Sequence, residues 1–189
     1  MSKLFGEHLC RQYKIIFNLN YNILRFFTVY SENQPTSLLF GKFAQMVKED
    51  KPVTIHGDGE MRRDYIHVSD VATACIASME SKVKNDTFNV GTGTNVSVNE
   101  VVDVLKKFAP NLTAINIDKP KGYAPHTLAD ISKSKNLLNF FCIYTRTCER
   151  DFKKGEKFSP INIGILRPSL GLHPRYYFKI IGKKSLKNI

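Results

Sequence analysis

The part of this sequence that most resembles a phosphate-binding loop is the glycine-rich turn Gly91-Thr92-Gly93. It follows the apolar run "DTFNV" and precedes the helix-start signature Ser97-Val98-Asn99-Glu100. A dinucleotide-binding loop has the pattern G-x-G-x-x-G, whose backbone approaches the pyrophosphate. Val96 occupies the third glycine position. The pattern therefore predicts a structural turn between a strand and a helix.

Two adjacent arginines, Arg62 and Arg63, stand at the entrance of the predicted strand "RDYIHV" (63–68). A guanidinium group is always charged and can bind two oxygens at once, which suits it to phosphate groups. The alternative is an ordinary surface arginine, and Arg62 is the better candidate for that role. The four cysteines show no metal-type spacing and are too few for a disulfide scaffold. They favour a reducing cytoplasm.

Helix and strand signals alternate through the first 140 residues. Strands are predicted at 21–30, 51–55, 63–68, 86–90 and 113–117. Helices are predicted from Ser2 to Asn18, from Thr36 or Ser37 to Glu49, after a cap at Ser69, after a capping box at 97–100, and from near Ser132. The helix after Ser69 is predicted to bury Val71, Ala72, Cys75, Ile76 and Met79. Such alternation is typical of an α/β fold with parallel pairing.

The composition is that of a soluble globular chain, with 42% hydrophobic and 24% charged residues. No run approaches the roughly 18 apolar residues of a membrane span, and no export leader is recognised. The net charge of +11 is concentrated in residues 141–189, where 11 Lys and Arg face 3 Asp and Glu. This segment has no sustained periodicity, so we expect a basic, irregular tail with little tertiary structure.

Five segments in order resemble the second half of the NAD-dependent epimerase/dehydratase family, the extended short-chain dehydrogenases. They are "SKLFGEHLC", "LRFFTVY", "IHGDGEMRRDYIHVSDVATA", "FNVGTG" and "LADISKSKNLL". "LRFFTVY" looks most like the UDP-glucuronate 4-epimerases. The resemblance implies the C-terminal part of a Rossmann-type parallel sheet with a smaller α/β substrate-binding domain. Residues 1–34 would end the Rossmann domain, 35–140 would form mostly the substrate-binding domain with some elements returning to the sheet, and 141–189 the tail.

The resemblance also implies a catalytic role for Lys3, which matches the lysine of the family's Tyr-x-x-x-Lys motif. In that motif the tyrosine lies one helical turn before the lysine, so the two side chains share a face. The ammonium group favours the phenolate, which can then take a proton from a sugar hydroxyl. The lysine also holds the nicotinamide ribose. The printed sequence has no residue four positions before Lys3, and a solvated helix-start lysine is the alternative.

Further ligand contacts follow from the same resemblance. Phe26 would face the NAD cofactor, Phe27 and Thr28 the sugar, and Arg63 the diphosphate. Aromatic residues in a strand are otherwise often core residues, and Thr28 stands where many members have asparagine. Other substrate contacts are implied at Leu38, Leu39, Thr54, Ile55, His56 and Lys121.

Residues 54–56 match the segment that packs on the uracil ring. His56 is interpreted as a residue at the edge of a turn rather than as a catalyst. Lys121 lies where many members carry the arginine of Arg-x-Gly-Asp, and Tyr123 replaces the aspartate. Lys121 can supply a point charge there, but a tyrosine cannot replace the carboxylate.

The implied reaction is at C4 of a UDP- or dTDP-sugar, by transient oxidation with NAD. We expect this chain to be a truncated form, inactive and without NAD binding when isolated, because it lacks the tyrosine and the glycine fingerprint. The implied partners are a nucleotide-sugar and a second copy in a homodimer, with no membrane and no nucleic acid. The alternative is a basic protein that binds nucleic acid or anionic lipid through residues 141–189.

Removing the tail separates these two classes of function. We expect only weak, salt-sensitive binding of a single-stranded oligonucleotide, because the basic residues follow no helical or strand period that would align them. Titrations of the full chain and of a chain ending at Phe140, at low and at physiological salt, measure this. Tight binding that survives physiological salt and vanishes on truncation would favour the basic binding protein.

Overall fold

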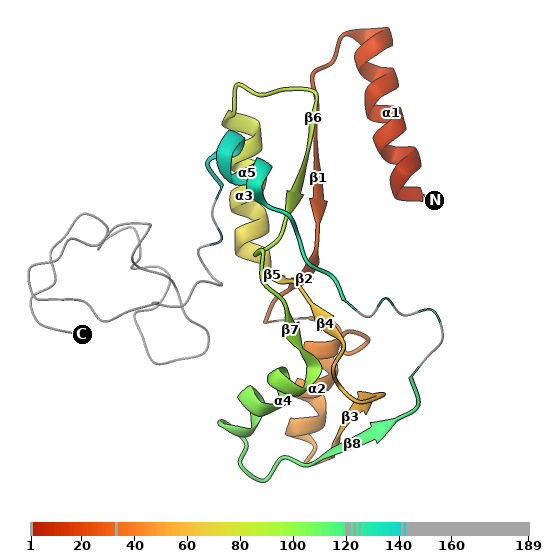
Figure 1. Cartoon of the computed structure of the whole chain (residues 1–189), viewed down its shortest axis with the longest axis vertical. Helices are drawn as coiled ribbons and strands as arrows, with labels where there is room; N and C mark the ends of the chain where they lie inside the picture. Colours follow the sequence, from red (N-terminus) through yellow and green to blue (C-terminus); the bar gives the residue numbers. More distant parts are fainter. Residues whose placement is uncertain are drawn as a thin grey trace, which may run out of the picture.

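The computed structural model describes residues 2–32, 34–119, 122, 124, 126–140 and 142. Helices and strands alternate as predicted, and the fold is α/β (Figure 1). In chain order they are α1 (Ser2–Phe17), β1 (Asn22–Phe26), β2 (Thr28–Tyr30), α2 (Leu39–Lys48), β3 (Val53–His56), β4 (Arg62–Arg63), β5 (Tyr65–His67), α3 (Val68–Glu80), β6 (Asp86–Val90), β7 (Val96–Ser97), α4 (Val98–Lys106), β8 (Ala114–Ile117) and α5 (Ser132–Leu138). Lys121 and the predicted tail, apart from Cys142, lie outside the described residues.

The strands form four pairs. Three are parallel (β1 with β6, β2 with β5, β3 with β8), and β4 with β7 is antiparallel. The prediction of one strand over 21–30 was wrong, because the chain changes partners at Phe27. The Phe27 N–H donates to the Val90 carbonyl at 3.0 Å, and the Thr28 N–H donates to the Asp64 carbonyl at 3.0 Å. Phe27 and Thr28 therefore connect the carboxyl end of β6 to the start of β5.

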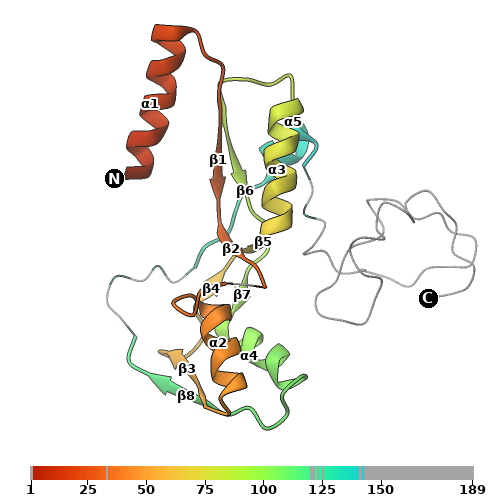
Figure 2. The ribbon, with the colours of Figure 1, turned by 180° about the vertical axis from the view of Figure 1, so that it is seen from behind.

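Two clusters of buried apolar residues hold these elements together. The first lies among β1, β6, α3 and α5, and its buried members are Ile66, Ala74, Phe88, Val90, Leu138, Phe140 and Cys142. The second lies among α2, β3 and α4, and its buried members are Phe43, Val53, Ile55, Val98, Val101 and Val102. Figures 1 and 2 show the two groups of elements at opposite ends of an elongated molecule, joined through β2, β4, β5 and β7.

The helix starts agree only in part with the predicted caps. The capping box is confirmed, since Ser97 and Glu100 bond each other's backbone N–H groups at the start of α4. The predicted cap at Ser69 was wrong because α3 begins at Val68, and Nδ1 of His67 accepts the Ser69 N–H at 3.2 Å. The caps predicted for α2 were also wrong, since Leu38 holds that position without a side-chain bond.

The predicted buried face of α3 was wrong in part, since Val71 packs against the first cluster as predicted but Ala72 is exposed. Ile76 and Met79 are exposed, whereas Asp70, Ala74 and Ser78 are buried. Small side chains on the inner face let a helix approach a strand closely. A polar contact then locks this orientation, because the Asn22 amide of β1 donates to both the hydroxyl and the carbonyl of Ser78.

Helix α1 has no buried side chain. It lies on one side of the β1–β6 pair, with α3 and α5 on the other (Figures 1 and 2). Its apolar side chains face outward, with Phe5 65% and Ile16 66% exposed, and Leu9 between them in the same stripe is also exposed. None of the described helices combines the length and the apolar character needed to cross a membrane.

The exposed stripe of α1 predicts an association-prone protein. Replacing Phe5, Leu9 and Ile16 together with lysine is expected to lower the apparent mass in light scattering and the fluorescence of a hydrophobic dye. Met79→Lys on α3 is the matched control, because Met79 is exposed outside this stripe. A monomeric wild-type chain that binds no dye, or an equal effect of Met79→Lys, would contradict the prediction.

Candidate functional site

The candidate site is built around the buried carboxylate of Asp64, between β4 and β5. The side chain is fully buried. One carboxylate oxygen accepts the Thr92 N–H and the Thr92 hydroxyl, each at 2.8 Å. The other accepts the N–H groups of Gly93 at 3.0 Å and Ala129 at 3.1 Å. The carboxylate therefore fastens the turn after β6 and the segment before α5 to the strand entrance.

The glycine-rich turn is structural, as predicted. Two of its N–H groups, at Thr92 and Gly93, donate to Asp64 and so are already engaged. Gly91 is required by close contact, since a Cβ atom there would lie 2.6 Å from the Ala129 Cβ and 2.8 Å from an Asp64 oxygen. Gly93 has a φ of +74°, which favours glycine. This turn does not cradle a phosphate in the described arrangement.

The two adjacent arginines differ in their surroundings. Arg62 donates to the side chain and carbonyl of Asn95 and pairs with Glu100 at 2.9 Å. Bonding from the Ser97 N–H, and then from Arg62, lowers the pKa of Glu100 from its ordinary value. Arg62 thus joins β4 to the first turn of α4, which is a structural role.

Arg63 is the arginine implied for the diphosphate. Its guanidinium donates to the Arg62 carbonyl at 2.9 Å and contacts the Met61 sulfur at 3.1 Å. Burial raises the pKa of the neighbouring Tyr65, and the charge of Arg63 opposes that effect. Tyr65 is therefore a neutral phenol at neutral pH and cannot replace a catalytic phenolate.

The structure brings four of the predicted ligand residues to one junction. Phe26 ends β1 and is 45% exposed. Phe27 and Thr28 follow it, both partly buried. The bond from the Thr28 N–H to the Asp64 carbonyl places Thr28 beside the residue that follows Arg63. The roles implied for these four residues stay predictions, but their proximity is a property of the fold.

The remaining predicted residues lie on β3 and at the start of α2. The Ile55 side chain is buried in the second cluster, so only its backbone could meet a ligand. The Thr54 hydroxyl is buried and has no hydrogen-bond partner among the described residues. His56 ends β3, at the edge of the turn as predicted, with Nδ1 at 3.2 Å from the Asp118 carbonyl oxygen. Leu38 is exposed, and Leu39 packs on the second cluster.

Lys3 is exposed on α1 and makes no ion pair within the described part of the chain. Among the described residues, no hydrogen bond joins Lys3 to the junction at Arg63. No group of His, Cys, Asp and Glu side chains suited to a metal ion occurs in the described ranges.

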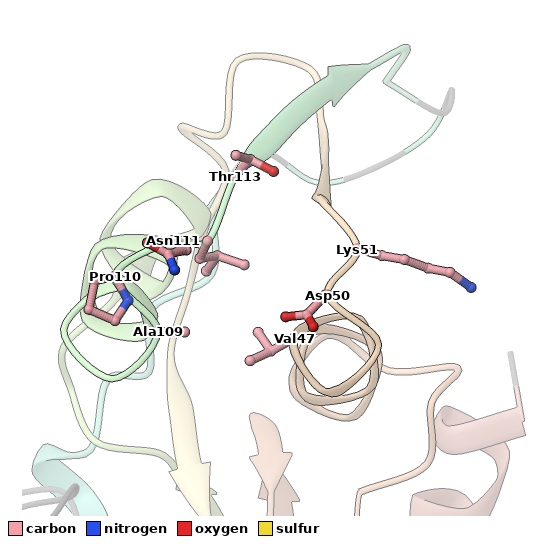
Figure 3. Close-up of a pocket in the computed structure, with 8 residues that line it drawn as sticks. Val47, Asp50, Lys51, Ala109, Pro110, Asn111 and Thr113 are labelled. Atoms are coloured by element: carbon pink, nitrogen blue, oxygen red, sulfur yellow. The ribbon is translucent and has the colours of Figure 1, made fainter.

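A separate hollow of about 180 Å³ lies between the end of α2 and the segment after α4 (Figure 3). Val47 and Asp50 point into it toward Ala109, while Lys51 points away. It lies at the amino ends of β3 and β8, whereas His56 lies at the carboxyl end of β3. Ligands of open α/β sheets bind at the carboxyl ends of strands, so the hollow is not part of the candidate site.

Parallel strands that alternate with helices, with the candidate ligand residues at strand ends, are typical of a Rossmann-type α/β fold. The model of the NAD dependent epimerase/dehydratase family matches residues 1–91 of this chain. Among curated relatives, the chain is 35% identical over 142 residues to the uncharacterized UDP-glucose epimerase YtcB of Bacillus subtilis, covering 74% of this chain and 45% of that protein. It is 30% identical over 141 residues to a UDP-glucuronate 4-epimerase of Thermodesulfobacterium geofontis, covering 74% and 43%.

Solved structures agree with this match. A mutant UDP-glucuronic acid 4-epimerase from Bacillus cereus, in complex with UDP-4-deoxy-4-fluoro-glucuronic acid and NAD, has a TM-score of 0.71 and 33% identity, covering 77% of this chain and 47% of that chain. UDP-glucose 4-epimerase from Thermotoga maritima, solved with UDP-glucose, has a TM-score of 0.70 and 28% identity, covering 75% and 47%. The chain spans a little under half the length of these relatives.

Sequence reasoning missed two features of this region. The role of Asp64 was not predicted, although a carboxylate that is buried at the start of an apolar strand must have its hydrogen bonds satisfied. The ion pair between Glu7 of α1 and Arg25 of β1 was also missed. No local pattern reveals that pair, because it depends on where α1 lies against the strand.

Asp64→Asn is expected to destabilise the chain by about 1–3 kcal/mol in urea unfolding. The amide group would face backbone N–H donors and leave at least one of them unpaired in a buried place. Asp103→Asn is the control, because the Asp103 side chain is 70% exposed on α4, and its effect should stay within about 0.5 kcal/mol. Equal stability of the two variants would contradict the role given to Asp64.

Proposed function

We propose that this chain contributes the sugar-nucleotide-binding part of an NAD-dependent 4-epimerase that acts on UDP-sugars. The carrying observation is the junction just beyond the carboxyl end of β1, where the Thr28 N–H bonds the carbonyl of Asp64, the residue that follows Arg63. UDP-sugar epimerases among the relatives support the substrate class. A dTDP-sugar is the less favoured substrate.

In this proposal Arg63 binds the diphosphate, Phe27 and Thr28 contact the sugar, and residues 54–56 contact the uracil. Because the Ile55 side chain is buried, that contact is made by the backbone and by the flanking side chains. The Thr54 hydroxyl lies in the same segment. Lys121 would add a positive charge, as the resemblance implies.

The described residues fit only one side of NAD. The exposed side chains of Lys3 and Phe26 can contact its nicotinamide half. The described residues form no site for the pyrophosphate half. The N–H groups of Thr92 and Gly93 already donate to Asp64, and the 189 residues contain no G-x-G-x-x-G sequence. When bound, NAD would take up the hydride from the sugar C4. The printed chain alone is therefore expected neither to bind NAD nor to complete the reaction.

Two further features bear on the possible partners of this chain. The exposed stripe of α1 offers a surface for the homodimer that the resemblance implies. The rival function, binding of nucleic acid or anionic lipid by residues 141–189, rests on a segment outside the described residues and gains no support from the relatives.

Titration with UDP-glucuronate and with NAD tests the proposal. We expect amide chemical-shift changes with UDP-glucuronate at residues 54–56 and near Arg63, and none with NAD at the same concentration. Arg63→Ala should weaken binding of the sugar nucleotide about ten-fold, the size of a lost charge-assisted bond. Arg11→Ala, an exposed arginine on α1, is the control. Equal affinity of the two variants, or no binding by the wild-type chain, would refute the proposal.

A further inference from the structure

The ion pair between Glu7 and Arg25 is the main polar link between α1 and the strands. Nε and Nη2 of Arg25 each donate to a different oxygen of Glu7, both at 2.7 Å. The Glu7 side chain is only 13% exposed, although α1 has no fully buried residue. Within the described residues, no other ion pair joins α1 to a strand.

Lys3 and Glu7 are four residues apart in α1 and therefore neighbours on one face of the helix. A carboxylate and an ammonium at that spacing ordinarily attract each other. Here both oxygens of Glu7 are held by Arg25. That bonding lowers the pKa of Glu7, so the group is a carboxylate at neutral pH. Its negative charge is balanced by Arg25 rather than by Lys3.

We propose that Arg25 is a positioning residue for Lys3: by holding both oxygens of Glu7, it keeps that carboxylate from capturing the lysine ammonium. Lys3 is then left available for the ribose and the phenol that its family role requires. This inference rests on the proposed function for the meaning of Lys3. The charge balance around Lys3 can be measured without any ligand.

A purely structural ion pair makes a different prediction. If the pair only fastened α1 to β1, removing either partner would have the same effect on Lys3. If Arg25 neutralises Glu7, the two removals have opposite effects. Arg25→Gln leaves an unbalanced carboxylate that stabilises the Lys3 ammonium, whereas Glu7→Gln leaves an unbalanced guanidinium that disfavours it. Removing both should restore the original balance.

The test is the rate at which Lys3 is acylated in the full chain at fixed pH, followed by mass spectrometry. Only the neutral amine reacts, so the rate reports the charge balance. We expect Arg25→Gln to slow acylation about two-fold and Glu7→Gln to speed it about two-fold, the size of an i,i+4 ion pair. The double variant should return to the wild-type rate. Lys48 on α2 is the internal reference, and its rate should stay constant in every correctly folded variant.

Arg11, one turn after Glu7, also attracts that carboxylate, although more weakly than Arg25. Repeating the comparison in an Arg11→Gln background should enlarge the effect of Arg25→Gln. Arg25→Lys keeps the charge without the two-point bond and should fall between wild type and Arg25→Gln. Changes of the same sign in Arg25→Gln and Glu7→Gln, or no change in either, would overturn the proposal whether or not the chain binds a sugar nucleotide.

Discussion

The fold depends on the buried carboxylate of Asp64. A buried charge is costly unless its hydrogen bonds are satisfied, and here three backbone N–H groups and one hydroxyl satisfy it. Tyr65 and Ile66, the next two residues, pack on different clusters, the first on the α2–α4 side and the second on the β1–β6 side. Asp64 therefore stands where the two halves of the described chain meet.

In the proposed function, this junction sets where the sugar nucleotide is recognised. The carbonyl of Asp64 accepts the Thr28 N–H at the point where the chain leaves β1 for β2. Arg63 precedes that carbonyl, and Arg62 is engaged in the Asn95–Glu100 network. The fully buried Asp64 thus joins the chain segment that carries Arg63 to the end of β1. The hollow of Figure 3 lies at the opposite end of the β3–β8 pair.

Much of the fold could be predicted from local sequence. The alternation of apolar runs and caps predicts the helices and strands, and the capping box at Ser97 depends only on residues three apart. The predictions that were wrong concern features that depend on contacts between residues far apart in the sequence. The strand breaks at Phe27 because the residues before it pair with β6 and the residues after it pair with β5. The orientation of α3, which buries Ser78, depends on a hydrogen bond from the Asn22 amide to the Ser78 hydroxyl, 56 residues away in the sequence.

The candidate site could likewise be predicted from the sequence only in part. The resemblance predicted Arg63, Thr28 and Phe26 as ligand residues, and the fold gathers them. It also implied Ile55, whose side chain the second cluster buries. The roles of Asp64, Glu7 and Arg25 could not be predicted, because each depends on a contact between segments whose relative placement local patterns do not encode.

The most direct measurement is native-state hydrogen exchange of the backbone amides that bond Asp64. If this carboxylate joins the two clusters, the amides of Thr92, Gly93 and Ala129 should exchange as slowly as those of Ile66 and Val90 in the first cluster, and lose protection together with them. Fast exchange at Thr92, Gly93 and Ala129 while Ile66 and Val90 stay protected would contradict the central role of Asp64.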